Sequence, residues 1–277
     1  MKKKLISLML IASLLAFSGC ASTIATPTES AEPTELIVFA AASMTETLTE
    51  IAAMYEAENP DIKIVLTFDS SGTLKTQIEE GADCDVYIAA SQKPMNQLDI
   101  TSDESINTDG LDFVMQGTRR DILENKVVLC VPEGNPASIA SFDALAERLA
   151  SNSVFLAMGN ADVPVGQYSQ KILVYFGVDE TALANAGCIT YGSNVKEVVT
   201  QIEENTVDCG IVYCTDAFSA NLTIIDTATS EMCGQVVYPA AVMNGTEIPE
   251  VAAAFLEYLG TPKAAAVFED VGFTPLS

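Results

Sequence analysis

Four segments of the chain place small or hydroxyl-bearing residues where an apolar run ends and a helical pattern begins. They contain Ser43, the pair Ser70-Ser71, Asp162–Tyr168 and Gly192–Glu197. The start of a helix offers backbone N–H groups that have no partner inside the helix, and it carries the positive end of the helix dipole. Because such groups stabilise negative charge, the four segments are candidates for binding a small anion.

The same segments have less specific readings, and the rest of the sequence excludes several chemistries. A hydroxyl residue before a helix is most often an N-cap, so no single segment predicts a site. None contains the Gly-Lys-Ser/Thr of a P-loop, and the chain has no GxSxG nucleophile elbow. It contains no histidine, which excludes histidine bases, histidine metal ligands and a Ser-His-Asp triad. The nearby carboxylates of Asp69 and Asp162 leave a surface hydrolase as an alternative.

A tyrosine stands at the end of the apolar run Cys209–Tyr213. Its hydroxyl could donate one hydrogen bond to a ligand while the ring packs against the core. The alternative is an aromatic side chain that only covers the end of a strand. The sequence leaves both interpretations open.

The chain is strongly acidic, with 13 Lys and Arg against 38 Asp and Glu, a formal net charge of −25 over 277 residues. Nucleic-acid binding needs a surplus of Lys and Arg, so we exclude nucleic acid as a partner. The acidity does not oppose an anion site, because aligned amides act at close range and distant carboxylates are screened beyond about 8–10 Å. At roughly 100–200 residues per domain, the length suggests about two domains.

Apolar runs alternate with amphipathic runs along the chain, which predicts an α/β fold with βαβ units. The predicted strands are Leu36–Ala41, Lys63–Phe68, Asp85–Ala90, Val127–Val131, Val154–Met158, Gly210–Tyr213 and Val236–Val242. The predicted helical patterns lie within 44–55, 74–78, 168–175, 195–202, 249–259 and 262–268. With crossings near 123–132 and 236–243, one lobe is predicted at 35–122 with a return at 244–277, and the other at 123–243.

The N-terminus has the composition of an export signal. Three lysines at positions 2–4 precede the apolar run Leu5–Phe17, which is too short to span a bilayer. The run ends in Ser18-Gly19-Cys20, which resembles a bacterial lipobox and implies cleavage before Cys20 and lipidation of its thiol. We therefore predict a signal peptide at 1–19 and a flexible tether at 20–34. The alternative is an ordinary signal peptide with an incidental cysteine.

Six further cysteines follow the tether. They are Cys84, Cys130, Cys188, Cys209, Cys214 and Cys233. An exported chain with an even number of cysteines could form disulfides. Three of the six lie in or beside apolar runs, where a free cysteine behaves as a small hydrophobic residue, so we predict mostly reduced thiols. No CxxC pair occurs and the spacings fit no usual zinc site, so we predict no metal ion.

Several segments, taken in order, resemble the molybdate-binding proteins of bacterial ABC importers. The resemblance rests on Val38–Thr45, Phe68–Leu74, Ile78–Ser91, Asp162–Tyr168, Gly210–Tyr213, Tyr238–Val242 and Gly272-Phe273. It covers nearly all of the chain after the tether and implies a two-lobed periplasmic-binding-protein type II fold with a ligand cleft between the lobes. It also implies a protein that captures molybdate or tungstate, closes on it and delivers it to an ABC permease, with no cofactor and no enzymatic activity.

Carried over to this sequence, the resemblance implies five ligand contacts: the hydroxyls of Ser43, Ser71 and Tyr213 and the backbone N–H groups of Val165 and Val195. A fully ionised dianion only accepts hydrogen bonds, so these donors suit it, whereas a protonated phosphate leaves one proton unpaired. The alternatives are a receptor for sulfate, phosphate or an iron–anion complex. We expect a monomer held by a lipid anchor on the outer face of the cell membrane.

Overall fold

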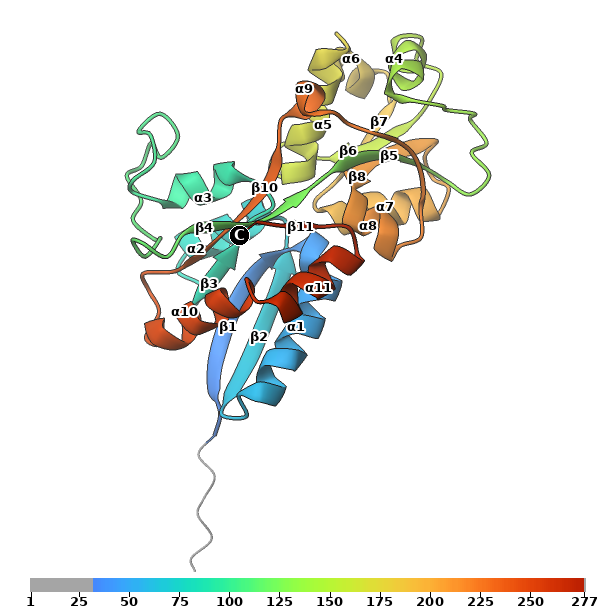
Figure 1. Cartoon of the computed structure of the whole chain (residues 1–277). Helices are drawn as coiled ribbons and strands as arrows, with labels where there is room; N and C mark the ends of the chain where they lie inside the picture. Colours follow the sequence, from blue (N-terminus) through green and yellow to red (C-terminus); the bar gives the residue numbers. More distant parts are fainter. Residues whose placement is uncertain (1–31, 277) are drawn as a thin grey trace, which may run out of the picture. The chain divides into compact units, whose positions relative to one another are not determined.

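The computed structural model describes residues 32–276. The predicted signal peptide, the predicted lipidation site at Cys20 and the predicted tether up to residue 31 lie outside the described residues. From Pro33 onward the chain forms one compact unit that contains two β-sheets with helices packed on them (Figure 1). Among the described residues, no helix is long and apolar enough to cross a membrane.

The first sheet has six strands in the order β11-β4-β10-β3-β1-β2. These are β1 (Thr34–Ala41), β2 (Ile62–Asp69), β3 (Val86–Ile88), β4 (Arg120–Asn125), β10 (Val236–Val242) and β11 (Thr274–Pro275). Strand β1 is parallel to β2 and β3, whereas β10 is antiparallel to β3 and β4. The parallel part forms because a helix follows each of the first two strands and carries the chain back to the same starting edge.

Helices cover both faces of this sheet, as the alternation of side chains along β1 shows. Val38 and Ala40 belong to a core with α1 (Thr45–Glu58), α10 (Pro249–Tyr258) and α11 (Pro262–Asp270). Phe39, which points the other way, packs with α2 (Ser71–Glu79) and α3 (Gln92–Leu98). We call this sheet and its helices lobe I.

The second sheet has five strands in the order β7-β6-β8-β5-β9. These are β5 (Val127–Val131), β6 (Leu156–Gly159), β7 (Ile189–Gly192), β8 (Cys209–Tyr213) and β9 (Thr223–Thr227). Its helices are α4 (Phe142–Ala150), α5 (Pro164–Tyr175), α6 (Glu180–Asn185), α7 (Val195–Glu203), α8 (Cys214–Ser219) and α9 (Ser230–Cys233). Strand β6 is parallel to both β7 and β8. We call this sheet and its helices lobe II.

The chain crosses between the sheets twice. The first crossing joins β4 directly to β5 around Asn125 and Lys126, and the second lies between β9 and β10. The predicted ranges differ from this sheet membership. The range 123–243 included β10, which pairs with β3 and β4 in lobe I, and the range 35–122 ended inside β4. An apolar run identifies a strand but not the sheet that it joins, so the return to lobe I was predicted too late.

The predicted α/β class is confirmed, and all seven predicted strands are present with ends within two residues of those observed. The six cysteines after the tether, which we predicted to be mostly reduced, are all free thiols, and all of them except Cys214 are buried. Strands β4, β7, β9 and β11 were not predicted. Each of the four carries exposed or half-exposed residues, so a continuous apolar run is missing.

Candidate functional site

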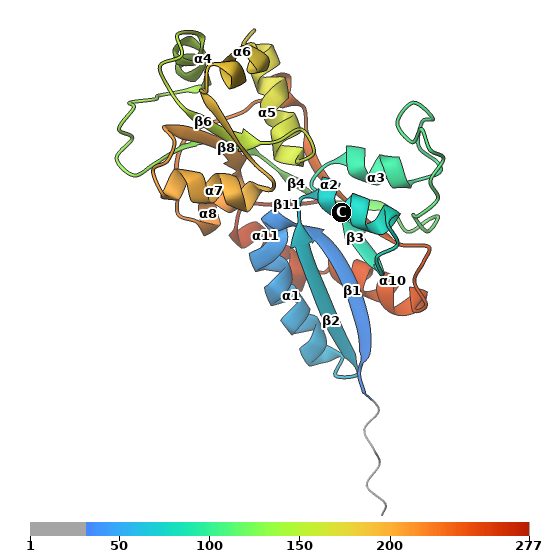
Figure 2. The same cartoon turned by 180° about the vertical axis from the view of Figure 1, so that it is seen from behind.

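The carboxyl ends of β1 and β2 place the two predicted serines beside each other. Ala41 and Asp69, the last residues of these parallel strands, are paired in register. Ser43 follows in a short 3₁₀ turn (Ala42–Met44), and Ser71 is the first residue of α2. Both serines are buried. In Figure 2 both strands point toward lobe II.

The adjacent residues Ser70 and Ser71 form different hydrogen bonds. Ser70 is the N-cap of α2, and its Oγ accepts a hydrogen bond of 3.1 Å from the Thr73 backbone N–H. Ser71 Oγ instead accepts a hydrogen bond of 2.9 Å from the Ala90 backbone N–H. Because that bond occupies a lone pair, the Ser71 hydroxyl proton is left to donate. Ser70 Oγ also lies 2.8 Å from Thr73 Oγ1, which can accept its proton, so Ser71 remains the serine that we predict to contact an anion.

The other three predicted residues lie at one edge of the sheet of lobe II. Val165 is the second residue of α5 after β6, Val195 is the first residue of α7 after β7, and Tyr213 ends β8. These strands are neighbours in the order β7-β6-β8. Both valine side chains are buried, so the groups that they can offer to a ligand are the backbone N–H groups of a first helical turn.

The start of α5 lies unusually close to the end of β6, and this closeness depends on Gly166. A Cβ at Gly166 would stand 2.1 Å from the carbonyl oxygen of Asn160 and 2.3 Å from that of Gly159. Pro164 begins the helix, where its missing N–H costs no helical hydrogen bond. The sequence thus fixes where the Val165 N–H lies relative to the sheet.

Tyr213 places a buried hydroxyl at this edge of lobe II. The side chain is only 2% exposed, and its hydroxyl has no hydrogen-bond partner among the described residues. The ring packs edge-on against Tyr168 and Tyr238, with centroids 6.3 and 5.9 Å away. Burial raises the pKa of Tyr213 well above its ordinary value, so the group remains a hydrogen-bond donor. A buried donor normally finds an acceptor, which an oxyanion would provide.

The edges of the two lobes approach each other at two places. At the α2 side, a Cβ on Gly72 would stand 2.3 Å from the carbonyl oxygen of Asp162, which shortly precedes α5. At the α7 side, Lys196 Nζ lies 2.8 Å from both carboxylate oxygens of Glu46. Lys196 follows Val195 directly, and Glu46 lies three residues after Ser43. All five predicted residues are therefore brought to facing edges of the two lobes.

Sequence reasoning missed the buried polar residues that support this region. Lys196 Nζ also lies 3.2 Å from Asp216 Oδ1, and the Asp216 side chain is fully buried in α8. Tyr238 Oη lies 2.9 Å from Ser43 Oγ, and Asn125 Nδ2 donates to Tyr238 Oη at 3.2 Å. The sequence held no local signal for these residues, because each contact joins segments more than ninety residues apart or residues on two helices.

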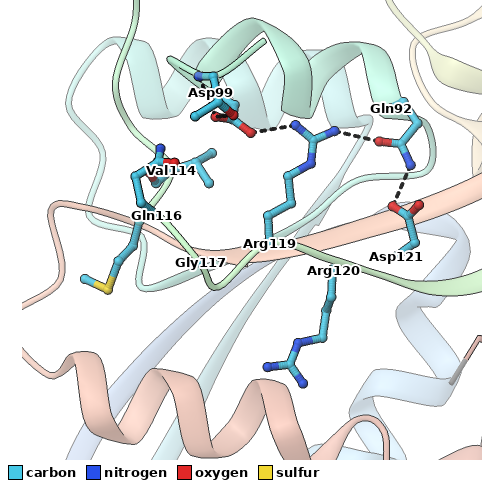
Figure 3. A pocket seen from close by; sticks show the side chains of 10 residues that line it. Gln92, Asp99, Val114, Gln116, Gly117, Arg119, Arg120 and Asp121 are labelled. Atoms are coloured by element: carbon cyan, nitrogen blue, oxygen red, sulfur yellow. Dashed lines mark hydrogen bonds and ion pairs between the residues drawn. The ribbon is translucent and has the colours of Figure 1, made fainter.

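A different cavity, of about 330 Å³, lies in lobe I beside Arg119 and Arg120 (Figure 3). The Arg119 guanidinium donates to Asp99 Oδ2 at 2.7 Å, to Gln92 Oε1 at 2.6 Å and to Asn96 Oδ1. Gln92 in turn donates to Asp121. Arg119 is thus occupied in holding α3 against the strand region, and we do not assign this cavity to the anion. The described residues also hold no group of three potential metal ligands.

Comparison with known proteins identifies the family. The sequence profile of the family described as bacterial extracellular solute-binding protein matches residues 36–274. The chain is 31% identical over 275 residues to YvgL of Bacillus subtilis, named as a candidate ABC transporter substrate-binding lipoprotein, across 99% of this chain and 98% of YvgL. It is 31% identical over 262 residues to the molybdate-binding protein ModA of Escherichia coli, across 93% of this chain and 96% of ModA.

The fold is also that of a solved relative. The periplasmic molybdate-binding protein of Azotobacter vinelandii superposes with a TM-score of 0.72 at 22% identity, covering 87% of this chain and 100% of the other. The likeness at that identity supports the two-lobed periplasmic-binding-protein type II fold. With this fold, the profile match over most of its length and two relatives at 31% identity, the chain belongs to the bacterial extracellular solute-binding proteins of ABC transporters.

Proposed function

We propose that this protein captures molybdate or tungstate outside the cell membrane and delivers it to an ABC permease. The observation that carries the proposal is the buried Tyr213 hydroxyl, which has no partner among the described residues and lies on an edge that faces two buried serines. The ModA relatives, named for molybdate binding, support the choice of anion.

The ligand groups that we propose are the hydroxyls of Ser43, Ser71 and Tyr213 and the N–H groups of Val165 and Val195. All five are neutral donors, which suits a fully ionised tetrahedral dianion. Hydrogen bonds to a charged acceptor contribute roughly 1.5–3 kcal/mol each, so five of them can hold an anion tightly after the cost of immobilisation. In this proposal the anchor is a lipid on Cys20, which is favoured by the lipobox resemblance and by the name of YvgL.

The proposal is tested by melting the purified full chain with molybdate, tungstate, sulfate, phosphate, chromate and vanadate at equal ionic strength. A ligand that binds only the folded state raises the melting temperature according to its concentration over its Kd. We expect large shifts with molybdate and tungstate alone. A shift with sulfate or phosphate instead would assign the site to another oxyanion, and no shift with any anion would reject an oxyanion receptor.

Replacing Ser71 by alanine is expected to weaken molybdate binding by about 1–3 kcal/mol, because one donor to a charged acceptor is removed. Titration calorimetry measures the loss. The matched control is Ser70→Ala, which removes the N-cap of α2 and is expected to cost about 0.5–2 kcal/mol of stability while leaving the affinity close to that of the unmodified protein. If Ser70→Ala lost the affinity and Ser71→Ala kept it, the assignment of the two serines would be reversed.

A further inference from the structure

A chain of buried hydrogen bonds leads from the crossing between the lobes to Ser43. It begins at Asn125, whose Oδ1 accepts a hydrogen bond of 2.8 Å from the Lys126 backbone N–H. Since a backbone N–H can only donate, this contact identifies the oxygen of the amide. The other amide atom is then the nitrogen, which donates to Thr215 Oγ1 at 3.0 Å and to Tyr238 Oη at 3.2 Å.

The direction of the hydrogen bond between Tyr238 and Ser43 follows from the bond that Asn125 donates to Tyr238. Tyr238 is fully buried, and burial is the largest cause that raises its pKa well above the ordinary value, so the phenol keeps its proton. Its oxygen already accepts from Asn125, and its other described neighbour at hydrogen-bond distance is Ser43 Oγ, 2.9 Å away. If Ser43 donated to Tyr238, the buried phenol proton would lack an acceptor among the described residues. Tyr238 therefore donates to Ser43.

With one lone pair occupied by Tyr238, Ser43 has its own proton left to donate. Ser71 is in the same condition, because the Ala90 N–H occupies a lone pair of its oxygen. We propose that Asn125 and Tyr238 are positioning residues that keep the Ser43 proton free to donate and so favour oxyanions that carry no proton. This inference rests on the proposed function, since it specifies how the same site tells a dianion such as molybdate from hydrogen phosphate.

One substitution can reverse the donor and acceptor roles along this series of hydrogen bonds. In Asn125→Asp, a carboxylate accepts from the Lys126 N–H and can accept from the hydroxyls of Thr215 and Tyr238; these bonds oppose the rise in pKa that burial causes, and measurement at pH 8 favours the charged form further. Tyr238 then points its proton away from Ser43, and Ser43 donates to Tyr238 Oη. The serine now presents lone pairs to the ligand, which repel a dianion and accept the proton of hydrogen phosphate.

The experiment measures the Kd of molybdate by calorimetry and that of phosphate by displacement of molybdate, both at pH 8. At that pH phosphate still carries a proton. At pH 8 the titratable groups that face the cluster are each in one protonation state in the unmodified protein. Asp216, with a pKa raised by burial to about 6, is ionised, whereas Tyr168 and Tyr213 are protonated because burial raises their pKa values.

In Asn125→Asp we expect molybdate affinity to fall by roughly 10- to 100-fold and the preference for molybdate over phosphate to fall at least about tenfold. Tyr238→Phe removes the last donor of the chain without a new charge, and it is expected to reduce the preference by a smaller factor. This second variant keeps the test valid if Asn125→Asp does not fold. Thr215→Val removes the other hydrogen bond of Asn125 at the same crossing, and the preference should stay within about twofold of the original protein.

The outcomes separate the inference from the function on which it rests. If the unmodified protein binds no oxyanion, the proposed function fails. If it binds molybdate but Asn125→Asp and Tyr238→Phe weaken molybdate and phosphate by equal factors, or leave both unchanged, the two residues have only a structural role. The same conclusion follows if Thr215→Val changes the preference as strongly as Asn125→Asp, because the effect would then belong to the crossing itself.

Discussion

Replacing Lys196 by methionine is expected to lower the free energy of unfolding by about 3–5 kcal/mol at pH 8, because it leaves a buried carboxylate without its charged partner. Both side-chain oxygens of Asp216 are buried, and neither accepts a hydrogen bond from another described side chain; Oδ1 forms an ion pair with Lys196 Nζ at 3.2 Å. Methionine has a similar length and packs in irregular spaces, so little of the loss is due to a cavity. Urea denaturation of the ligand-free protein measures the change.

The same variant should show a specific dependence on pH. Burial is the largest cause of the raised pKa of Asp216, about 6 against 3.8 for an ordinary aspartate, and the charge of Lys196 opposes that rise. The folded state thus binds this proton more tightly than the unfolded state. The stability that protonation of Asp216 contributes is fully present below about pH 4 and is lost as the pH rises through about 6. Without Lys196 the pKa rises further, so Lys196→Met should destabilise the protein less at pH 5 than at pH 8.

Two further variants show whether the buried carboxylate is the cause. Adding Asp216→Asn to Lys196→Met removes the charge, and it is expected to restore most of the lost stability and to abolish the extra pH dependence. Glu46→Gln removes the half-exposed partner of Lys196 and should cost only about 0–1 kcal/mol. A loss below 1 kcal/mol in Lys196→Met, equal at both pH values, would contradict the role of the pair.

Most of the strands that the sequence predicted are largely buried, although β2 was also predicted and has a single buried residue, Ile64. The strand Val127–Val131 is fully buried and forms one apolar run, which local periodicity detects. Strand β4 was missed because it carries exposed Arg120 and Asp121 at its start, and β9 because it lies at the sheet edge with no fully buried residue. Strand β10 was predicted with its observed bounds but assigned to the wrong lobe, since the choice of sheet depends on long-range pairing.

Part of the candidate site could also be predicted from local sequence patterns, and part could not. Helix starts after apolar runs are local patterns, so the segments with Ser43, Ser71 and Val165 could be singled out from the sequence, and the family resemblance specified which residue in each offers a contact. The roles of Asn125 and Tyr238 could not be predicted from the sequence, because their hydrogen bond forms only when β4 pairs with β10. Their chemical roles depend on which lone pairs and protons are already used, and only the folded arrangement determines that.

The approach of the two lobes at Gly72 gives the second large expected effect. Gly72 is the second residue of α2 in lobe I, and a Cβ there would stand 2.3 Å from the carbonyl oxygen of Asp162 in lobe II. Real Cβ atoms do not approach a backbone oxygen this closely, so a side chain must push the two edges apart. If the protein closes on its ligand as the family resemblance implies, the contact belongs to the closed, ligand-holding arrangement.

We therefore expect Gly72→Ala to weaken molybdate binding by between roughly 10- and 100-fold, because about 1–3 kcal/mol of overpacking falls on the closed arrangement. The ligand-free protein should lose no stability and can gain up to about 1 kcal/mol, since alanine favours the helix more than glycine does. Gly245→Ala, at a site with no neighbour within 4 Å, is the matched control and should change neither quantity beyond about 1 kcal/mol. Calorimetry gives the affinity and urea denaturation the stability. If Gly72→Ala leaves the affinity unchanged, the edges of α2 and α5 stand farther apart when the anion is bound. If stability and affinity fall equally, the substitution strains the fold of lobe I and not the closure of the lobes.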